Sequence, residues 1–276
     1  MPSVPTNPTE LRDAVVVVTA GGNGIGAALA RRFAAEGAAH VAVLDRDGDA
    51  ATRVAAEIGG SSAVVDVTDE TALSDELRRL IEQHGRIDIC CSNAGVQAVG
   101  GAETPDDKWQ VAWDVNLMSQ VYAARVLVPH YLERGRGTFL QTASAGGLMT
   151  ELGSAAYSVT KAGVISFAEW LSISYRRQGV AVSVLCPAGV QTDFLNHDDP
   201  AHSFLHGHAI PPEDVADAAV RGLVAGEFLI VPDEHDKVRE FYAEKGKDYD
   251  RYLHIFSRIA QKVQRVRDRK AKKSDG

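Results

Sequence analysis

The chain has 276 residues, of which 45% are hydrophobic and 24% are charged, and its net charge is −8. This balance is typical of a globular protein and excludes the composition of disordered, collagen-like and coiled-coil chains. The acidic charge argues against an enzyme of nucleic acids, and no apolar run approaches the roughly 20 residues that cross a bilayer. The length favours one large domain.

The first residues and the cysteines indicate the compartment. Residues 1–11 lack the basic patch and apolar core of a secretory signal, and we expect a flexible lead there. The three cysteines, Cys90, Cys91 and Cys186, lie in apolar runs without metal-ligand spacing. We therefore expect a reduced cytoplasmic protein with no disulfide and no metal.

Apolar, β-branched segments alternate with segments of helical periodicity along most of the chain. Parallel pairing with right-handed crossovers follows from this alternation, so we predict an α/β fold with a doubly wound parallel sheet of about seven strands. The predicted strands cover 13–20, 40–45, 62–66, 86–95, 137–144, 180–189 and 227–233. The predicted helices cover 24–38, 47–58, 69–84, 106–134, 154–178 and 212–226. Thr68 is the predicted N-cap of the third helix, and Gly85 ends it.

Two segments depart from the alternation. Residues 193–211 form a long irregular connection, which we interpret as a substrate lid. Residues 235–276 form a charged helical extension, whose last 19 residues carry eight Lys and Arg against two Asp. One interpretation is a helix that docks on the acidic body or on a neighbouring subunit and helps to close the pocket. The other is a basic arm for a membrane surface or a nucleic acid.

A glycine-rich turn joins the first predicted strand to the first helix, with the sequence TAGGNGIG at 19–26. Glycines let the backbone approach a pyrophosphate, and the helix N-terminus supplies free N–H groups. Asp45 ends the second strand, where a carboxylate accepts hydrogen bonds from an adenosine ribose and repels a 2′-phosphate. Arg46 is the one neighbouring cation that a 2′-phosphate would meet, and we favour NAD over NADP. Asp66 follows the third strand and is placed to meet the adenine amino group; the alternative is a turn or capping role.

A Tyr–Lys pair lies on the helix predicted over 154–178. Tyr157 and Lys161 are four residues apart and share one face. A neighbouring ammonium favours the phenolate, which makes a tyrosine usable as a general acid/base near neutral pH. Ser144 ends a strand at the edge where doubly wound sheets bind ligands, and its hydroxyl is placed to hold a substrate oxygen.

These motifs together resemble the short-chain dehydrogenase/reductase family, in its ordinary single-domain NAD(P)-dependent branch. The resemblance covers about residues 12–233 and includes the 13-residue step from Ser144 to Tyr157. It implies a Rossmann-type dehydrogenase domain over 12–234. The matching motifs are TAGGNGIG at 19–26, Asp45, Asp66, SNAG at 92–95, Asn116, Ser144, YSVTK at 157–161 and PAGVQT at 187–192.

The resemblance implies a role for each matching residue. Tyr157 would exchange a proton with the substrate oxygen, Lys161 would lower the pKa of Tyr157 and hold the nicotinamide ribose, and Ser144 would polarise the substrate oxygen. Asn116 would hold a water in a proton relay behind Lys161; the alternative is that it satisfies buried backbone groups. The implied cofactor-binding residues are Thr19, Gly21, Asn23, Gly24, Ile25, Gly26, Asp45, Arg46, Asp66, Val67, Asn93, Ala94, Gly95, Tyr157, Lys161, Pro187, Gly189, Val190 and Thr192.

Two alanines stand where the family usually has glycine. They are Ala20, after the first Thr of the loop, and Ala188, after Pro187. Because a Cβ disfavours positive φ, we expect negative φ at both positions, with a small local adjustment and retained cofactor binding.

The expected substrate pocket is mostly apolar, which favours a hydrophobic, cyclic or aromatic alcohol. Glu151 is available for one further polar contact. His202, His206 and His208 cluster in the lid, where we expect solvated side chains rather than a metal site. The candidate pocket residues are Val96, Gln97, Leu148, Met149, Leu152, Phe194, Leu195 and Phe204.

The sequence therefore predicts an NAD-dependent enzyme that interconverts a secondary alcohol and a ketone on a small-molecule substrate. An NADPH-dependent ketone reductase of a biosynthetic pathway is the alternative, and a non-catalytic NAD-binding sensor is a third hypothesis. We expect no nucleic-acid or membrane partner. The apolar faces of helices 106–134 and 154–178 exceed what one sheet face covers, and in the resembling family these helices pair between subunits. A homotetramer is the expected assembly, with a dimer next.

Overall fold

The computed structural model describes residues 8–194 and 209–274, with side chains described up to residue 266. Within these ranges a seven-stranded sheet has the order β3-β2-β1-β4-β5-β6-β7, and each neighbouring pair is parallel. The predicted doubly wound sheet is confirmed. The strands are β1 (Val15–Thr19), β2 (His40–Asp45), β3 (Ser61–Val64), β4 (Ile89–Ser92), β5 (Gly137–Thr142), β6 (Val180–Leu185) and β7 (Leu229–Ile230).

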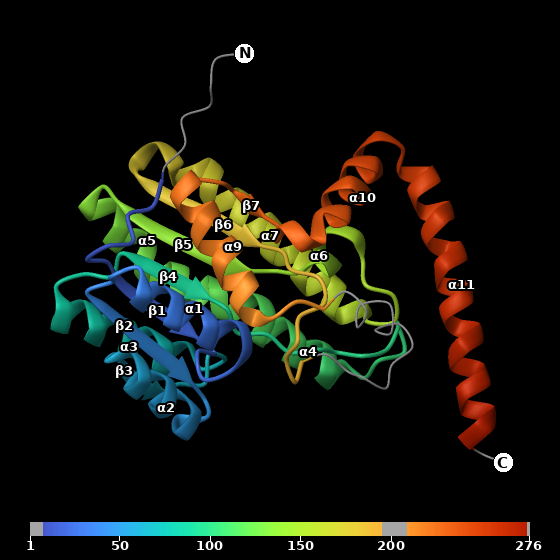
Figure 1. Ribbon diagram of the computed structural model, residues 1–276, viewed down its shortest axis with the longest axis horizontal. Coiled ribbons are helices and arrows are strands. Elements are labelled where there is room, and N and C mark those ends of the chain that lie inside the picture. The colour runs from blue at the N-terminus through green and yellow to red at the C-terminus, as the bar shows by residue number, and fades with distance from the viewer. Residues whose placement is uncertain (1–7, 195–208, 275–276) are drawn as a thin grey trace.

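Helices cover both faces of this sheet (Figure 1). Apolar residues of α1, α2 and α9 form one core with the sheet, and those of α3, α5 and α7 form the other. The helices of the body are α1 (Gly24–Ala35), α2 (Gly48–Ile58), α3 (Glu70–His84), α4 (Asp106–Trp113), α5 (Ser119–Arg134), α6 (Ala145–Met149), α7 (Ala155–Tyr175) and α9 (Pro212–Ala225). Cys90, Cys91 and Cys186 are buried free thiols in these cores.

The helix predicted over 106–134 is not uniform. A π-helical segment, Asp114–Met118, separates α4 from α5 and carries Asn116. Side chains satisfy carbonyls in this wider turn, because Ser119 Oγ donates to the Val115 carbonyl and Gln120 Nε2 to the Asn116 carbonyl. Hydrophobic periodicity did not reveal the interruption, since the helix axis continues through it. Asn116 is buried within this segment, as is common for π-helical turns at functional sites.

The turns between elements explain where helices begin and end. The prediction of Thr68 as N-cap of α3 was wrong: Asp69 caps it by accepting from the backbone N–H groups of Thr71 and Ala72. Thr68 instead donates to Asp66. Gly85 ends α3 in the left-handed conformation, as predicted. The short helix α6 was not predicted, because five residues are too few to show a period.

The C-terminal extension consists of α10 (Asp236–Lys247) and α11 (Tyr249–Ser274), after a short 3-10 turn, Asp233–His235. Lys245 Nζ donates a 2.7 Å hydrogen bond to the carbonyl of Leu148, and the hydroxyl of Tyr252 donates to the carbonyl of Met149. These bonds fix α10 and the first turn of α11 on α6, whereas the rest of α11 runs past the body (Figure 1). Docking on the body therefore holds for the beginning of the extension.

Candidate active site

The glycine-rich turn brings the backbone close to the start of α1. A Cβ at Gly26 would lie 2.1 Å from the carbonyl oxygen of Ala20 and 2.7 Å from Asn93 Nδ2, so only glycine fits there. Asn23 precedes α1 without capping it through its side chain, which leaves the N–H groups of the first turn available. Thr19 Oγ1 accepts from the backbone N–H of Asn93 at 3.0 Å and ties this turn to the end of β4.

Ala20 adopts φ of +50°, so the expectation of negative φ was wrong at this position. The tight turn between β1 and Gly26 requires the left-handed conformation whatever side chain is present. Ala188 is not among the described residues with positive φ, as expected for a residue with a Cβ. Ala20 thus carries backbone strain, whereas Ala188 does not.

Asp45 lies beside the same turn. Its Oδ2 accepts from the backbone N–H of Gly22 at 2.9 Å, and its Oδ1 accepts from that of Asp47 at 3.0 Å. Arg46 is exposed. Asp66 is also exposed and accepts from both the backbone N–H and the hydroxyl of Thr68, which lowers the pKa of its carboxyl. Asp66 thus has the turn role that the sequence left open.

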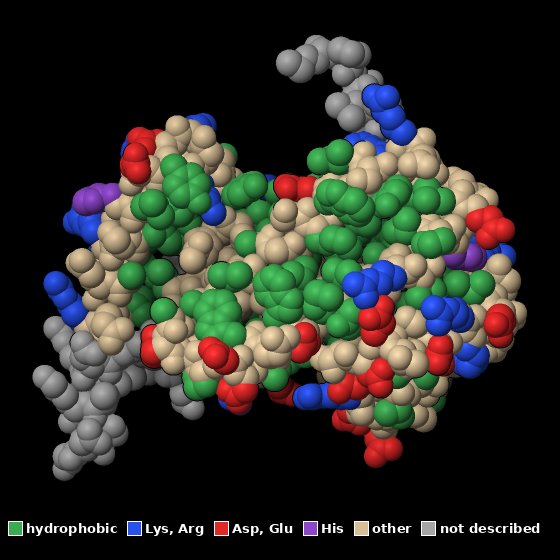
Figure 2. Space-filling model, turned by 180° about the vertical axis from the view of Figure 1, so that it is seen from behind, with side chains coloured by type: hydrophobic (Ala, Val, Ile, Leu, Met, Phe, Trp, Pro, Cys, Tyr) green, Lys and Arg blue, Asp and Glu red, His purple; other side chains and the backbone are tan. Residues whose placement is uncertain are grey.

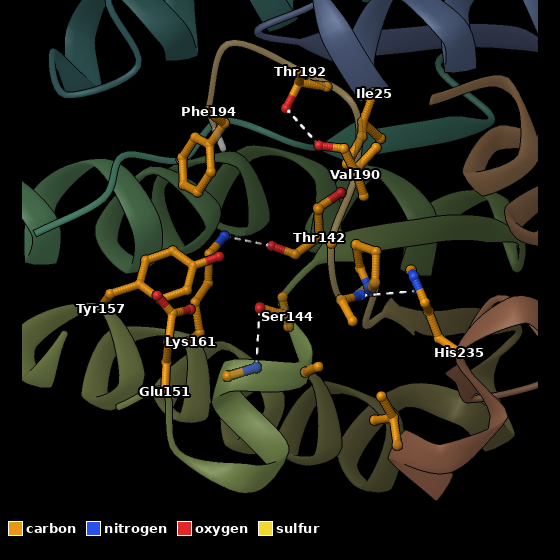
Figure 3. A pocket seen from close by; sticks show the side chains of 18 of the residues that line it. Ile25, Thr142, Ser144, Glu151, Tyr157, Lys161, Val190, Thr192, Phe194 and His235 are labelled. Carbon is orange, nitrogen blue, oxygen red and sulfur yellow. Dashed lines mark hydrogen bonds between the residues drawn. The ribbon is translucent and has the colours of Figure 1, made fainter. Parts of the chain in front are cut away.

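Ser144, Tyr157 and Lys161 converge on one wall of a cavity (Figure 3). Ser144 caps α6 by accepting from the backbone N–H of Gly146 at 3.0 Å. Lys161 Nζ donates a 2.8 Å hydrogen bond to the carbonyl of Thr142, at the end of β5, and lies 5.8 Å from the centroid of the Tyr157 ring. The ring of Phe194 lies over the other side, with centroids 5.8 Å apart.

Burial shifts the pKa values of Tyr157 and Lys161 in opposite directions. It raises the pKa of Tyr157 well above its usual value, the charge of Glu151 raises it further, and the hydrogen bond with Ser144 lowers it. Burial lowers the pKa of Lys161 to about 8. The protein alone therefore keeps the phenol protonated, and the ammonium is the group nearer to titration at neutral pH.

Asn116 is fully buried behind this wall and does not line the cavity. Its side-chain amide forms two hydrogen bonds with the backbone of Val96. Oδ1 accepts from the N–H at 2.7 Å, and Nδ2 donates to the carbonyl at 3.1 Å. Its Nδ2 also donates to Thr160 Oγ1 at 3.0 Å. A Cβ at Gly95 would lie 3.1 Å from Lys161 Nζ and 3.4 Å from Asn116 Oδ1, so these two side chains approach the same strand end.

The turn at 187–192 forms the opposite wall. The carbonyl of Pro187 accepts from the backbone N–H of Ala145 at 2.9 Å, and the backbone N–H of Ala188 donates to His235 Nδ1 at 3.1 Å. His235 is buried and comes from the start of the C-terminal extension. The extension thus reaches the turn whose Val190 and Thr192 lie beside Ile25 of the glycine loop (Figure 3).

The cavity has a volume of about 960 Å³ and unites most predicted site residues. Of the predicted cofactor and catalytic residues, it is lined by Asn23, Gly24, Ile25, Asp45, Asn93, Gly95, Ser144, Tyr157, Lys161, Pro187, Gly189, Val190 and Thr192. The predicted residues outside its lining are Thr19, Gly21, Gly26, Arg46, Asp66, Val67, Ala94 and Asn116.

The candidate substrate residues divide in the same way. Gln97, Met149, Leu152 and Phe194 line the cavity, whereas Val96 and Leu148 are not among its lining residues. Leu195 and Phe204, like the lid histidines His202, His206 and His208, lie outside the described residues.

The C-terminal extension supplies one wall of the cavity, as one of the two interpretations of its sequence expected. The residues of this wall include His235, Val238, Phe241, Phe256, Ile259 and Val263. The apolar periodicity of residues 253–266 indicated a docking helix but did not show which of its side chains would face the cavity. Clusters of His, Cys, Asp and Glu that could hold a metal ion are absent from the part of the chain that the structure describes. The described helices include none long and apolar enough to cross a membrane.

Comparisons with known proteins agree with this geometry. A family model described as short chain dehydrogenase matches residues 14–202. The chain is 34% identical to a meso-2,3-butanediol dehydrogenase of Serratia marcescens over 223 residues, covering 77% of this chain and 87% of that protein. It is 35% identical to a 1-deoxy-11-beta-hydroxypentalenate dehydrogenase of Streptomyces exfoliatus over 238 residues, covering 83% of this chain and 86% of that protein.

A solved structure shares the architecture. It is a short chain dehydrogenase/reductase from Burkholderia phymatum in complex with NAD, with a TM-score of 0.78 and 25% identity over 87% of this chain and 95% of that one. The chain therefore belongs to the short-chain dehydrogenase/reductase family. It is an oxidoreductase with a Rossmann-type nicotinamide cofactor site.

The residues present fit such a cofactor. The close approach at Gly26 and the uncapped first turn of α1 form a cradle that a larger side chain would fill, next to N–H groups suited to a pyrophosphate. Asp45 borders the same cavity, at the end of β2. Tyr157 and Lys161 lie deeper in the cavity, on α7.

Proposed function

We propose that the protein is an NAD-dependent dehydrogenase that interconverts a secondary alcohol and a ketone, with Tyr157 as general acid/base. The observation that carries the proposal is the convergence of Ser144, Tyr157 and Lys161 on one cavity with the glycine-rich cradle. A protein that only bound a dinucleotide would need no buried phenol, hydroxyl and ammonium in its cavity.

The proposed mechanism assigns each group a task. Ser144 Oγ accepts from the backbone N–H of Gly146 and also bonds Tyr157, and we propose that a bound substrate oxygen takes the Ser144 proton. Tyr157 takes the hydroxyl proton during oxidation and returns it to the carbonyl oxygen during reduction. A nicotinamide cofactor bound in the cradle supplies the hydride acceptor.

Lys161 makes the proton transfer feasible. Burial disfavours the phenolate of Tyr157, and we propose that the ammonium, 5.8 Å from the ring centroid, offsets that penalty. The hydrogen bond to Thr142 uses one of the three ammonium protons, which leaves others for the nicotinamide ribose. Asn116 holds the end of β4 in place through Val96, and we propose that it also orders a water behind Lys161.

The cofactor preference rests on Asp45. Its carboxylate borders the cavity at the end of β2, where it would accept from the hydroxyls of an adenosine ribose and repel a 2′-phosphate. NAD is therefore the proposed cofactor. The relative of known structure that was solved with NAD is consistent with this choice.

The proposed substrate is a hydrophobic alcohol, cyclic or aromatic. Apolar side chains from three parts of the chain line the cavity, namely Met149 and Leu152, Phe194, and Val238 and Phe241, and the ring of Phe194 lies 5.8 Å from that of Tyr157. The names of the relatives support a secondary alcohol, since one is a butanediol dehydrogenase and another a hydroxypentalenate dehydrogenase.

The test is NADH formation from NAD against aliphatic, cyclic, aromatic and polycyclic secondary alcohols, with NADP in parallel. Tyr157→Phe should lower kcat by about 10²- to 10⁴-fold while NADH binding, followed by fluorescence, is retained. Tyr242→Phe is the control, because Tyr242 is on α10 and does not line the cavity. Full activity of Tyr157→Phe would refute the acid/base role, and turnover with NADP alone would favour the ketone reductase.

A further inference from the structure

Glu151 carries a carboxylate into the active-site cavity, next to the groups proposed for catalysis (Figure 3). A Cβ at Gly146 would lie 3.2 Å from Glu151 Oε2 and 3.4 Å from Ser144 Oγ, so both oxygens lie close to one point. The charge of Glu151 also acts on Tyr157, whose pKa it raises. The carboxylate is thus within reach of a substrate whose oxygen is bound between Ser144 and Tyr157.

The local backbone holds Glu151 in this position. The preceding residue, Thr150, adopts φ of +70°, which is unfavourable for a β-branched residue. The backbone N–H of Glu151 donates to Ser158 Oγ at 2.8 Å, and Ser158 Oγ donates back to the Glu151 carbonyl at 3.3 Å. Since Ser158 follows Tyr157 on α7, these bonds fix the backbone of Glu151 relative to Tyr157.

A carboxylate at position 151 is unfavourable for the proton transfer to Tyr157. Its negative charge opposes formation of the Tyr157 phenolate, and Met149, Leu152 and Phe194 around it make the wall largely apolar. An apolar side chain would serve an unsubstituted alcohol better. A donor on the substrate would add a hydrogen bond to this carboxylate and offset its charge at Tyr157.

The charges around the cavity limit which substrates fit. Three cations line its described part, namely Arg31, Lys161 and Lys237. The acidic lining residues are Asp45, Glu151, Asp193, Glu213, Glu234 and Asp236. An excess of carboxylates disfavours acidic substrates, such as hydroxy acids, and favours neutral or cationic ones.

We propose that Glu151 is a specificity-determining residue that selects alcohols carrying a second hydrogen-bond donor, a hydroxyl or an ammonium, on the carbon next to the carbinol. The substrate class is then a vicinal diol or amino alcohol on an apolar skeleton. This inference rests on the proposed dehydrogenase function and deepens it.

The second donor takes no part in the redox step. The carbinol C–H bond breaks and its electron pair leaves with the hydrogen to NAD, while the O–H proton goes to the phenolate form of Tyr157. The products are the ketone, with its neighbouring hydroxyl or ammonium unchanged, and NADH. Glu151 accepts a hydrogen bond throughout and needs no proton of its own.

The test compares four substrates built on one skeleton, the best unsubstituted alcohol of the panel. The adjacent carbon carries hydrogen, hydroxyl, ammonium or methoxy, and the methoxy compound is the matched control because it has the bulk without the donor. For the wild-type protein, kcat/KM should be about 10- to 100-fold higher for the hydroxyl and ammonium compounds than for the methoxy compound, as for hydrogen bonds to a charged group. Calorimetric titration of the same ligands reports their binding without turnover.

Two variants separate charge from hydrogen bonding. Glu151→Leu should remove the preference for both donors and leave the unsubstituted alcohol at least as good a substrate. Glu151→Gln should keep part of the preference for the hydroxyl and lose that for the ammonium, because the amide still accepts but carries no charge. Glu169→Gln, an exposed residue on α7, is the control and should change neither ratio.

The outcomes separate the role of Glu151 from the proposed dehydrogenase function. Equal kcat/KM and equal binding for the hydroxyl and methoxy compounds in the wild-type protein would overturn the role of Glu151, even if the unsubstituted alcohol is oxidised. An equal loss for all four substrates in Glu151→Leu would also overturn it, since the residue would then be only structural. Absence of Tyr157-dependent turnover with every skeleton would instead count against the proposed function, and donor-selective binding in the titration would still report on Glu151.

Discussion

Lys161 and Thr142 are joined by a 2.8 Å hydrogen bond from the ammonium to a backbone carbonyl at the end of β5. The bond directs a buried cation beneath the ring of Tyr157, where burial lowers the pKa of the ammonium to about 8. A cation in this position weakens the fold and favours the proposed proton transfer. The position is therefore one at which stability and activity should oppose each other.

Lys161→Met should make the protein more stable and inactive. Below pH 8 the lysine is charged in both the folded and unfolded states, so the full burial penalty is present. The shift of the Lys161 pKa from 10.5 to about 8 corresponds to a burial penalty of about 3 kcal/mol. The variant loses the hydrogen bond to Thr142, which costs about 1 kcal/mol. The expected net gain in the free energy of unfolding is therefore about 2 kcal/mol.

The stability gained in Lys161→Met should depend on pH. Between pH 8 and 10.5 the unfolded chain keeps the proton and the folded one releases it, so the wild-type protein should gain stability as the pH rises. The difference in the free energy of unfolding between Lys161→Met and the wild-type protein should therefore shrink between pH 8 and 10.5. Urea unfolding of both proteins at pH 7 and pH 9.5 measures it; a constant difference would contradict the assignment of the shift to Lys161.

Ala20→Gly should stabilise the protein. The left-handed conformation at φ of +50° costs about 1–2 kcal/mol for a residue with a Cβ, while glycine adds about 0.4–1 kcal/mol of unfolded-state entropy. The expected net gain is about 0.5–1 kcal/mol in the free energy of unfolding. Ala188→Gly is the matched control, because Ala188 has no positive φ, and it should destabilise. A loss of stability in Ala20→Gly would show that the turn is not strained.

The sequence was sufficient for the sheet and for most of the cavity, since each relied on local signals. Buried strands appear as continuous apolar runs, and Tyr157 and Lys161 share a helical face through spacing alone. Interactions across the chain could not be predicted in the same way. The bond from Tyr252 to Met149 spans 103 residues, and the one from His235 to Ala188 spans 47. The position of Glu151 depends on the unusual backbone of Thr150, which no residue type at that position signals.

Asp45→Asn should shift the cofactor preference toward NADP. The amide keeps an acceptor for the backbone N–H of Gly22 and removes the charge that would repel a 2′-phosphate. We expect the ratio of kcat/KM for NADP to that for NAD to rise by about 10-fold or more, on the order of one charged hydrogen bond. Asp47→Asn is the control: Asp47 caps α2 by accepting from the backbone N–H of Ala50, the amide keeps that acceptor, and neither the stability nor the ratio should change appreciably. An unchanged ratio in Asp45→Asn would remove the basis for preferring NAD.

The protein should be an oligomer in solution, a tetramer first and a dimer next. Apolar side chains gather on the face opposite to that of Figure 1 (Figure 2), and α7 exposes Val159, Trp170 and Ile173, the last at 84%. An apolar surface of this kind favours association with a second copy. Light scattering should give a mass of about four times 29.5 kDa, and Ile173→Glu should lower it. Val64→Glu, at an exposed valine on the edge strand β3, is the matched control and should leave the mass unchanged. A mass near 29.5 kDa for the wild-type protein would contradict the assembly, and the exposed face of α7 would then need another explanation.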